Sequence, residues 1–170
     1  MSSHGGTTSI PDFTIRSVEP EDVPLIHRLI LELADYEGLA HEVEATEDLL
    51  RENLFGSNAI VEVVLGCYQG VPVGFALLFQ NFSTFQGKPG IYLEDLYIRP
   101  EMRGKGMGTA LMAYLARLTL ERNGGRFEWG VLAWNTPARD YYVSIGAKPQ
   151  DRFLLNRLEG AALQVLADKL

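Results

Sequence analysis

The chain has 170 residues, of which 46% are hydrophobic and 22% are charged. This length fits one domain with a sizeable core, and the composition excludes a wholly disordered chain and a fibrous repeat. The formal net charge is −7, from 15 basic and 22 acidic residues, which argues against a non-specific nucleic-acid binder. The single cysteine, Cys67, excludes an intramolecular disulfide and a cysteine-based zinc cluster.

The amino terminus lacks the basic and apolar regions of a secretory signal, and no apolar run reaches the roughly 18 residues of a membrane-spanning helix. We therefore expect a cytoplasmic protein without a membrane partner. Residues 1–11 predict a flexible leader, and 12–170 predict a single domain. The histidines His4, His27 and His41 have no metal-ligand spacing, so no metal site is expected.

The first part of the chain predicts one strand and two helices. The strand is expected over 13–18, and the first helix begins at Pro20 and ends at Gly38. Its apolar residues recur at the helical spacing i, i+3, i+4 and i+7: Ile26, Leu29, Ile30 and Leu33. A shorter helix is expected between a cap at Thr46 and a stop at Gly56.

The middle of the chain predicts consecutive strands. Two β-rich runs, 59–69 and 71–83, are separated by Gly70 and read as a hairpin. A turn at 88–90 precedes a further strand over 91–100. Consecutive strands of this kind pair in antiparallel fashion.

The last third alternates helices and strands. A helix is expected between the glycine-rich segment 103–109 and the stop at 123–125, and a strand over 126–134. A short helix begins with the cap Thr136, and a last strand over 153–160 precedes a carboxy-terminal helix. The strand–helix–strand unit implies a parallel crossover. The prediction is therefore an α/β fold, with a mixed, mostly antiparallel sheet flanked by helices.

The segment that carries chemistry is RGKGMGT, residues 103–109, between a strand and a helix. Glycines let the backbone approach an anion, and the start of a helix attracts phosphate. Arg103 and Lys105 add positive charge. The spacing matches neither the nucleotide P-loop nor the dinucleotide fingerprint. The segment predicts a phosphate-bearing ligand, and a tight strand-to-helix turn is the alternative explanation of its glycines.

The pattern R-x-x-G-x-G in this position resembles the acetyl-CoA-binding loop of the GCN5-related N-acetyltransferase (GNAT) superfamily. The resemblance spans roughly residues 13–160 and points to the branch of the spermidine/spermine N1-acetyltransferases and thialysine acetyltransferases. The further matching segments are Leu33-Ala34-x-Tyr36-Glu37, Tyr92-Leu93-Glu94-Asp95, Leu96-Tyr97-Ile98, Trp134-Asn135-x-Pro137 and Tyr142-x-x-x-Gly146-Ala147.

This resemblance implies the GNAT acyl-CoA N-acyltransferase fold and acetyl-CoA as cofactor, with CoA as product. The loop would cradle the pyrophosphate, and the backbone of 96–98 would pair with the pantetheine arm. The implied cofactor-binding residues are Leu96, Tyr97, Ile98, Arg103, Gly104, Lys105, Gly106, Met107, Gly108, Thr109, Asn135, Pro137, Ala138 and Tyr142.

The resemblance also implies two catalytic residues, Tyr142 as general acid and Glu94 as a base that acts directly or through water. An ammonium must lose a proton before it can attack, and a departing thiolate benefits from a phenol that protonates it. A backbone N–H near Leu96 is the expected oxyanion donor. Glu94 and Asp95 are consecutive on a strand, so we expect them to face opposite sides. A merely solvated Glu94 is the alternative.

On the acceptor side, acidic and aromatic residues suit a cationic amine. The implied substrate-binding residues are Tyr36, Glu37, Glu94, Glu128, Trp129, Gly130 and Asp151. We therefore predict an N-acetyltransferase that acts on a primary amine of a diamine, a polyamine or a lysine-like amino acid. The transfer would be direct, in a ternary complex, and the family implies a homodimer.

Two alternatives stay open at this point. The same donor could serve a protein, peptide or aminoglycoside amine. The chain could instead be a CoA-binding module without turnover, although Tyr142 and Glu94 argue against that.

Overall fold

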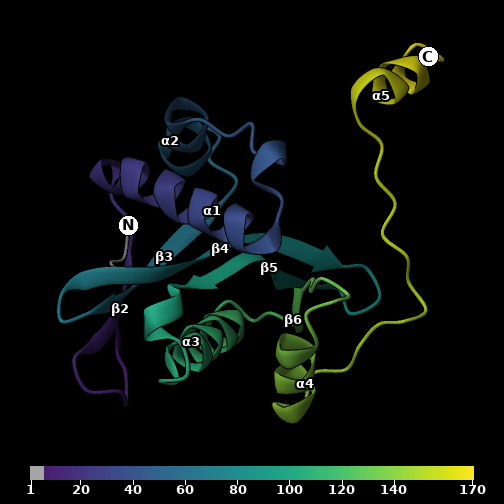
Figure 1. The fold of residues 1–170 in the computed structure, drawn as a ribbon. Coiled ribbons are helices and arrows are strands. Elements are labelled where there is room, and N and C mark those ends of the chain that lie inside the picture. The colour runs from purple at the N-terminus through teal and green to yellow at the C-terminus, as the bar shows by residue number, and fades with distance from the viewer. Residues whose placement is uncertain (1–5) are drawn as a thin grey trace. The chain divides into compact units, whose positions relative to one another are not determined.

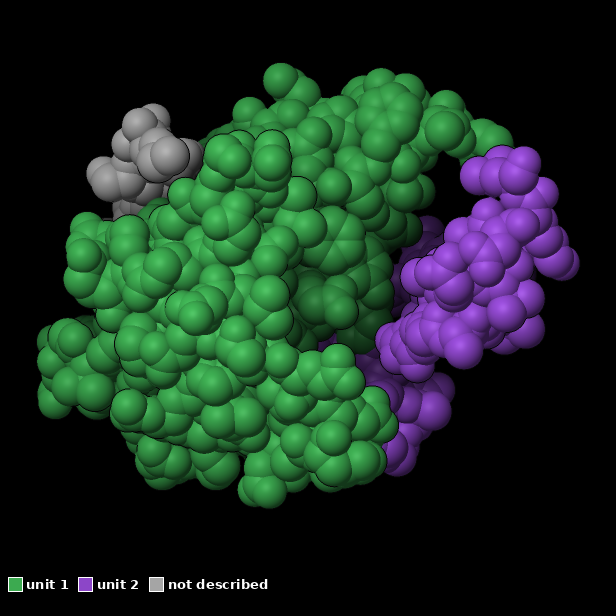
Figure 2. All heavy atoms as spheres, turned by 90° about the horizontal axis from the view of Figure 1, so that it is seen from above, with its two compact units in different colours: residues 1–130 green, residues 131–170 purple. Residues whose placement is uncertain are grey.

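The computed structural model describes residues 6–170, so His4 and the first five residues of the expected leader lie outside the described residues. The chain divides into two compact units, residues 1–130 and residues 131–170 (Figure 2). The first unit contains the whole sheet, and the second contains two helices. The expected single domain over 12–170 stays a prediction.

The sheet of the first unit has six strands in the order in which they follow along the chain. Every neighbouring pair is antiparallel except the last, β5 with β6, which is parallel. The predicted mixed, mostly antiparallel sheet is therefore confirmed. The strands are β1 (Gly6–Thr7), β2 (Phe13–Ser17), β3 (Glu62–Tyr68), β4 (Val71–Ser83), β5 (Lys88–Ile98) and β6 (Arg126–Trp129).

Helices flank both faces of this sheet: α1 and α2 cover one face, and α3 covers the other (Figure 1). In the first unit they are η1 (Pro20–Asp22), α1 (Val23–Glu37), η2 (Ala40–Glu42), α2 (Glu47–Phe55), η3 (Pro100–Met102) and α3 (Met107–Glu121). The second unit contains α4 (Thr136–Ser144) and α5 (Gly160–Ala167). Between residues 6 and 170, no helix has the length and hydropathy that crossing a bilayer requires.

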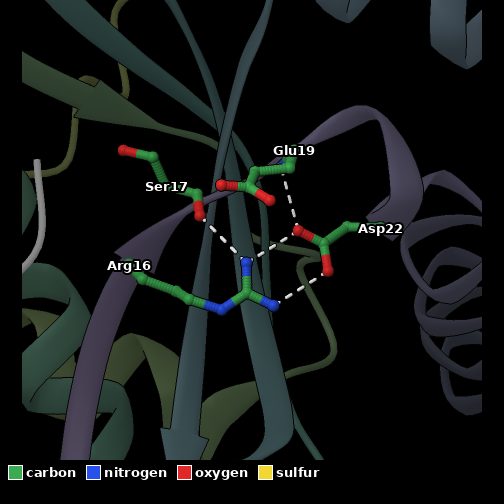
Figure 3. A network of polar contacts seen from close by, with 4 residues as sticks. All are labelled: Arg16, Ser17, Glu19 and Asp22. Carbon is green, nitrogen blue, oxygen red and sulfur yellow. Dashed lines mark hydrogen bonds and ion pairs between the residues drawn. The ribbon is translucent and has the colours of Figure 1, made fainter. Parts of the chain in front are cut away.

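Local signals end α1 and begin α2 as predicted. Gly38 stops α1 with a φ of 75°, a left-handed conformation that favours glycine. The hydroxyl of Thr46 caps α2 by accepting a hydrogen bond from the Leu49 amide at 3.2 Å. The turn before α1 is fixed by Arg16, whose guanidinium donates to both carboxylate oxygens of Asp22 at 2.7 and 2.8 Å (Figure 3).

The main core lies between the sheet and the pair α1 and α2. It is built from the apolar face of α1, including the fully buried Val23, Ile26 and Leu29, packed against Leu65 and Phe75 of the sheet. On the opposite face, α3 contributes the fully buried Leu111 and Leu115. These two layers hold β5 between them, so its position relative to α1 and α3 is fixed by packing.

The predicted hairpin is confirmed, since Gln69 and Gly70 both adopt positive φ between β3 and β4. The predicted turn at 88–90 is wrong, because these residues begin β5 and the turn lies at 84–87. Pro89 is tolerated in the strand because its carbonyl accepts from the Gly125 amide. Its ring nitrogen therefore faces away from β4, where no ladder hydrogen bond is lost.

Two predicted strands differ from the structure. The strand expected over 126–134 ends at Trp129, because its ladder with β5 stops at Leu93. The strand expected over 153–160 is wrong, since 153–159 has no regular structure. A strand needs a partner, and the second unit contains no other strand.

Candidate active site

The glycine-rich loop joins η3 to α3 and has the backbone of an anion site. Gly104 and Gly106 adopt φ values of 73° and 80°, which favour glycine, and Gly106 caps α3. The helical ladder begins where the Ala110 amide donates to the Gly106 carbonyl at 2.9 Å, so the amides of Met107 and Gly108 precede it. A Cβ added at Gly108 would meet nothing within 4 Å. The first turn of α3 is therefore open to a phosphate-bearing ligand.

The two basic residues of this loop are turned toward the protein. Arg103 Nε donates to the Ile98 carbonyl at 2.8 Å. Its guanidinium carbon lies 4.3 Å from the ring centroid of Tyr36 and 5.5 Å from that of Tyr97. Lys105 Nζ donates to a backbone carbonyl of η3 at 3.2 Å. Arg103 thus ties the end of α1, on the predicted acceptor side, to the start of the cofactor loop.

The backbone of Leu96, Tyr97 and Ile98 lies on the part of β5 that extends beyond β6. The parallel ladder covers only Gly90 to Leu93, whereas β5 continues to Ile98. Within residues 6–170 no strand pairs with this segment on that side. The side chains of Tyr97 and Ile98 are buried, so the segment offers its backbone to a ligand. This fits the predicted pairing with an extended pantetheine arm.

A β-bulge lies where the two consecutive carboxylates occur. Leu77 of β4 pairs with Asp95, but the next residue, Leu78, pairs with Leu93. Glu94 is therefore the extra residue, and the alternation of side chains is broken there. Asp95 shares the face of Leu77, which belongs to the core under α1. Leu93 lies on the opposite face, because it pairs with Leu78, the neighbour of Leu77. Glu94 follows Leu93 and therefore lies on the same face as Asp95.

The expectation that Glu94 and Asp95 face opposite sides is therefore wrong, because the bulge adds one residue between the two registers. Both carboxylates lie on the face covered by α1, whose last residue is Glu37. The structure brings together three carboxylates from two elements that are far apart in the sequence. Sequence reasoning missed Asp95, and the available signal was a second carboxylate within an apolar strand.

The proximity of these carboxylates affects their electrostatics. Burial, followed by the negative charges of Glu94 and Glu37, raises the pKa of Asp95 to about 6. Burial also raises the pKa of Glu37. A carboxylate with a pKa near neutrality is suited to accept a proton from an ammonium and to release it again.

The acceptor-side residues of β6 are divided between the two faces of the sheet. Glu128 pairs with Tyr92, so it lies on the face of the carboxylates, and the charges of Glu94 and Glu128 both raise the Tyr92 pKa after burial. Trp129 pairs with Leu93 and lies on the α3 face. The structure therefore does not bring Trp129 together with Glu128. A Cβ at Gly130 would lie 3.6 Å from the Tyr92 hydroxyl.

The remaining predicted site residues belong to the second unit. Asn135, rather than the expected Thr136, caps α4, because Asn135 Oδ1 accepts from the Ala138 amide at 3.3 Å. Pro137 occupies the first turn of this helix. Asp151 is exposed in a turn.

Tyr142 is half-buried on α4, with its ring 5.5 Å from that of Tyr141. Burial, followed by Tyr141, raises the Tyr142 pKa, so the phenol keeps its proton at neutral pH. That suits a general acid. Its pairing with Glu94 stays a prediction.

Known proteins resemble this chain over nearly all of its length. Thialysine N-epsilon-acetyltransferase of Sus scrofa is 34% identical over 166 residues, which cover 91% of this chain and 97% of the relative. L-ornithine N5-acetyltransferase NATA1 of Arabidopsis thaliana is 31% identical, with coverages of 92% and 88%. Among solved structures, an integron cassette protein from V. cholerae superimposes with a TM-score of 0.76 at 28% identity, with coverages of 92% and 98%.

A model of the acetyltransferase (GNAT) family matches residues 26–147, a span that runs from the first turn of α1 to just beyond α4. It includes the glycine-rich loop, the bulge and Tyr142. The spermidine/spermine N(1)-acetyltransferase-like protein 1 of Homo sapiens is also related, at 32% identity over 148 residues, which cover 82% of this chain and 21% of the relative. The chain therefore belongs to the GNAT family, in its spermidine/spermine and thialysine branch, and is an N-acetyltransferase.

Proposed function

We propose that this enzyme transfers the acetyl group of acetyl-CoA to a primary amine of a small cationic acceptor, directly and within a ternary complex. The observation that carries the proposal is the bulge in β5. It places Glu94 and Asp95 on one face, at the point where the β5–β6 ladder ends. An amine that reaches these carboxylates from the α1 side would lie next to the backbone that the pantetheine arm is expected to follow.

The residues present fit acetyl-CoA. The loop from Gly104 to Thr109 offers amides and left-handed glycines to the pyrophosphate, and the open space above Gly108 leaves room for it. The backbone of 96–98 would bind the pantetheine arm. When bound, acetyl-CoA supplies an acetyl group activated as a thioester. In the second unit, Asn135, Pro137 and Ala138 would complete its binding.

The proton of the acceptor ammonium goes to the carboxylates. Glu94 is exposed and Asp95 is partly buried, so the two differ in their surroundings although they are neighbours. Glu94, directly or through water, would receive the ammonium first. Asp95, whose pKa is about 6, would share the proton that the amine must lose before it attacks. Glu37 adds negative charge that attracts the cation.

Tyr142 would hold a proton at its Oη for the departing thiolate. Its raised pKa keeps that proton in place until the thiolate forms. Tyr142→Phe should lower kcat by about 10²- to 10⁴-fold with little change in CoA affinity, the range typical of a lost general acid. Tyr141→Phe, one residue away on α4, is the matched control. Equal turnover of the wild type and Tyr142→Phe would remove this role.

Acceptor class is supported by charge and by the names of relatives. The face around Glu94 carries carboxylates and the stacked rings of Phe79 and Tyr92, whose centroids are 5.1 Å apart. Such a surface attracts cations. Relatives are named for thialysine and for ornithine, both of which carry a primary amine at the end of an aliphatic chain.

The test is an assay of thiol release from acetyl-CoA with a panel of amines: diamines, polyamines, lysine-like amino acids, aminoglycosides and lysine peptides. We expect turnover with small aliphatic amines. Turnover with peptides or aminoglycosides alone would overturn the acceptor class. Calorimetry with CoA is run in parallel, and the absence of binding would overturn the whole proposal. CoA binding without turnover on any amine would instead establish a binding module.

The homodimer expected from the family is also part of the proposal. In the second unit, α5 presents three exposed apolar side chains, Leu163, Val165 and Leu166. Contact between two copies would remove them from water. Light scattering coupled to gel filtration should give twice the mass of one chain, and a monomer at micromolar concentration would rule out this association.

A further inference from the structure

Beside the carboxylates of β5 lies a second polar group, built from three neighbouring strands. Asn81 of β4 and Arg126 of β6 are both paired with Gly90 of β5, so the three residues share one row across the sheet. A Cβ at Gly90 would lie 2.4 Å from Asn81 Oδ1 and 3.0 Å from Arg126 Cγ. The two side chains therefore lean over Gly90 from opposite sides, on the same face of the sheet.

Glu128 completes this group from the next row. Its carboxylate accepts a hydrogen bond from Asn81 Nδ2 at 2.8 Å and lies 2.9 Å from Arg126 Nε. Both charged side chains are 36% exposed, so a small solute can reach part of each, although Arg126 Nε itself is buried. The negative charges of Glu128 and Glu94 both act on the phenol of Tyr92, which places this group next to the bulge.

The group is not a closed structural network. Arg126 Nη2 donates to the Phe82 carbonyl at 3.3 Å, whereas Arg126 Nε is close enough to Glu128 for an ion pair but has no hydrogen bond among the described residues. Asn81 Oδ1 is likewise buried without a donor among the described residues. Buried polar atoms are normally satisfied, and leaving them so is costly. One acceptor for Arg126 and one donor for Asn81 would complete the group.

We propose that Asn81, Arg126 and Glu128 form a subsite for the zwitterionic head of an α-amino acid whose side chain ends in the reacting amine. The guanidinium of Arg126 binds the α-carboxylate. Glu128 and Asn81 Oδ1 accept hydrogen bonds from the α-ammonium after a small shift of the side chains. This subsite deepens the proposed function and rests on it.

Charge favours an amino acid over a diamine at this subsite. Arg126 and Glu128 carry opposite charges. The second ammonium of a diamine would be attracted by Glu128 and repelled by Arg126. An amino-acid head carries both charges and can pair with both residues. Arginine is suited to a carboxylate because it offers a planar pair of donors.

The spacing also fits. Glu128 of β6 is paired with Tyr92, two residues before Glu94 of β5, so Glu128 lies about 7 Å along the strand and about 5 Å across it from Glu94, which is about 8 Å away. With bond lengths of about 1.5 Å, the five bonds between the ω-nitrogen and the α-carbon of lysine span about 6 Å when extended. With a hydrogen bond of about 3 Å at each end, an amino acid of this length bridges the subsite and the carboxylates at the bulge.

The experiment compares three acceptors: L-lysine, L-lysine amide, which lacks the carboxylate, and Nα-acetyl-L-lysine, which lacks the α-ammonium. The ω-acetylated product is quantified by mass spectrometry. We expect wild-type kcat/KM for L-lysine to exceed that for either analogue by about 10- to 100-fold, as for loss of a charge-assisted hydrogen bond. Arg126→Gln should bring lysine and its amide to equality. Glu128→Gln should do the same for lysine and its Nα-acetyl form.

Arg117→Gln is the matched control, because this exposed arginine lies on α3, on the other side of the sheet. It should keep the wild-type ratios, and thermal unfolding checks that each variant is folded. If Arg126→Gln and Glu128→Gln keep the wild-type ratios of kcat/KM between L-lysine and its analogues, the proposed subsite is wrong, while the proposed acetyl transfer still stands. Acetylation of none of the acceptors, together with none of the amine panel, would be a failure of the proposed function itself.

Discussion

Replacing Asp95 by asparagine should stabilise the protein at alkaline pH. The carboxyl has an ordinary pKa of 3.8, and burial together with Glu94 and Glu37 raises it to about 6 in the folded protein. A difference of one in pKa corresponds to about 1.4 kcal/mol. The difference between 3.8 and about 6 therefore means that ionisation of Asp95 destabilises the folded state by at most about 3 kcal/mol. Asparagine has nearly the same shape and carries no charge.

The sign of the pH dependence follows from the raised pKa. The folded state binds the Asp95 proton more tightly than the unfolded state, so the penalty is absent below pH 3.8. It grows as pH rises from 3.8 to about 6 and is complete above that. We expect Asp95→Asn to raise the free energy of unfolding by about 3 kcal/mol at pH 8 and by less than about 1 kcal/mol at pH 4. For a chain of this length, 3 kcal/mol corresponds to about 6–12 °C in Tm.

Urea unfolding of both proteins at the two pH values measures this difference. Asp35→Asn, an exposed carboxylate on α1, is the control for removing one negative charge, and its effect should be small. In a protein that already carries Glu94→Gln, Asp95→Asn should give a smaller gain in the free energy of unfolding at pH 8, because Glu94 contributes to the raised pKa of Asp95. An equal gain from Asp95→Asn at pH 4 and pH 8 would refute the reasoning, since the stabilisation would then owe nothing to the charge.

Three further predictions concern packing and the cofactor loop. Arg103→Ala removes the contact with Tyr36 and should raise both the CoA Kd and the amine KM. A few-fold change is expected for an interaction of about 0.5–2 kcal/mol. A change in only one of the two constants would show that Arg103 does not couple the cofactor loop to the acceptor side. Gly74→Ala should destabilise β4 by about 1–3 kcal/mol in urea unfolding, because its Cβ would lie 2.4 Å from the Tyr97 carbonyl oxygen. Leu111→Ala should cost about 2–5 kcal/mol in the same assay, because the side chain is fully buried under the sheet.

The elements that could be predicted from the sequence are those with local causes. The helix over α1 follows from an apolar stripe and a glycine stop, and α2 follows from the Thr46 cap, both within a few residues of the feature they explain. The loop from Gly104 to Gly106 could be predicted for the same reason. A sharp turn with positive φ favours glycine, wherever the rest of the chain lies.

Features that depend on pairing between distant segments could not be predicted. The bulge at Glu94 exists because β4 and β5 pair in two registers, and no single strand carries that information. The turn at 84–87 was displaced for a similar reason: Pro89 suggests a turn, yet the register with β4 keeps it in the strand. The segment 153–159 shows the converse: its apolar residues suggest a strand, yet it forms none without a partner.

This difference between local and distant causes divides the proposed site into two halves, one proposed for the cofactor and one for the acceptor. The cofactor half, from Leu96 to Thr109, is nearly continuous in sequence, so its backbone geometry is set by one strand end, one loop and one helix start. The acceptor half is assembled from the end of α1, the bulge of β5 and the edge strand β6, which only the sheet brings together.

Side chains such as Arg126 and Glu128 can therefore change without disturbing the loop that the cofactor needs. It follows that a resemblance carried by the loop identifies the donor more securely than the acceptor. The identity of the acceptor has to be argued from charges on the face shared by Asp95 and Glu128, as the lysine analogues would test.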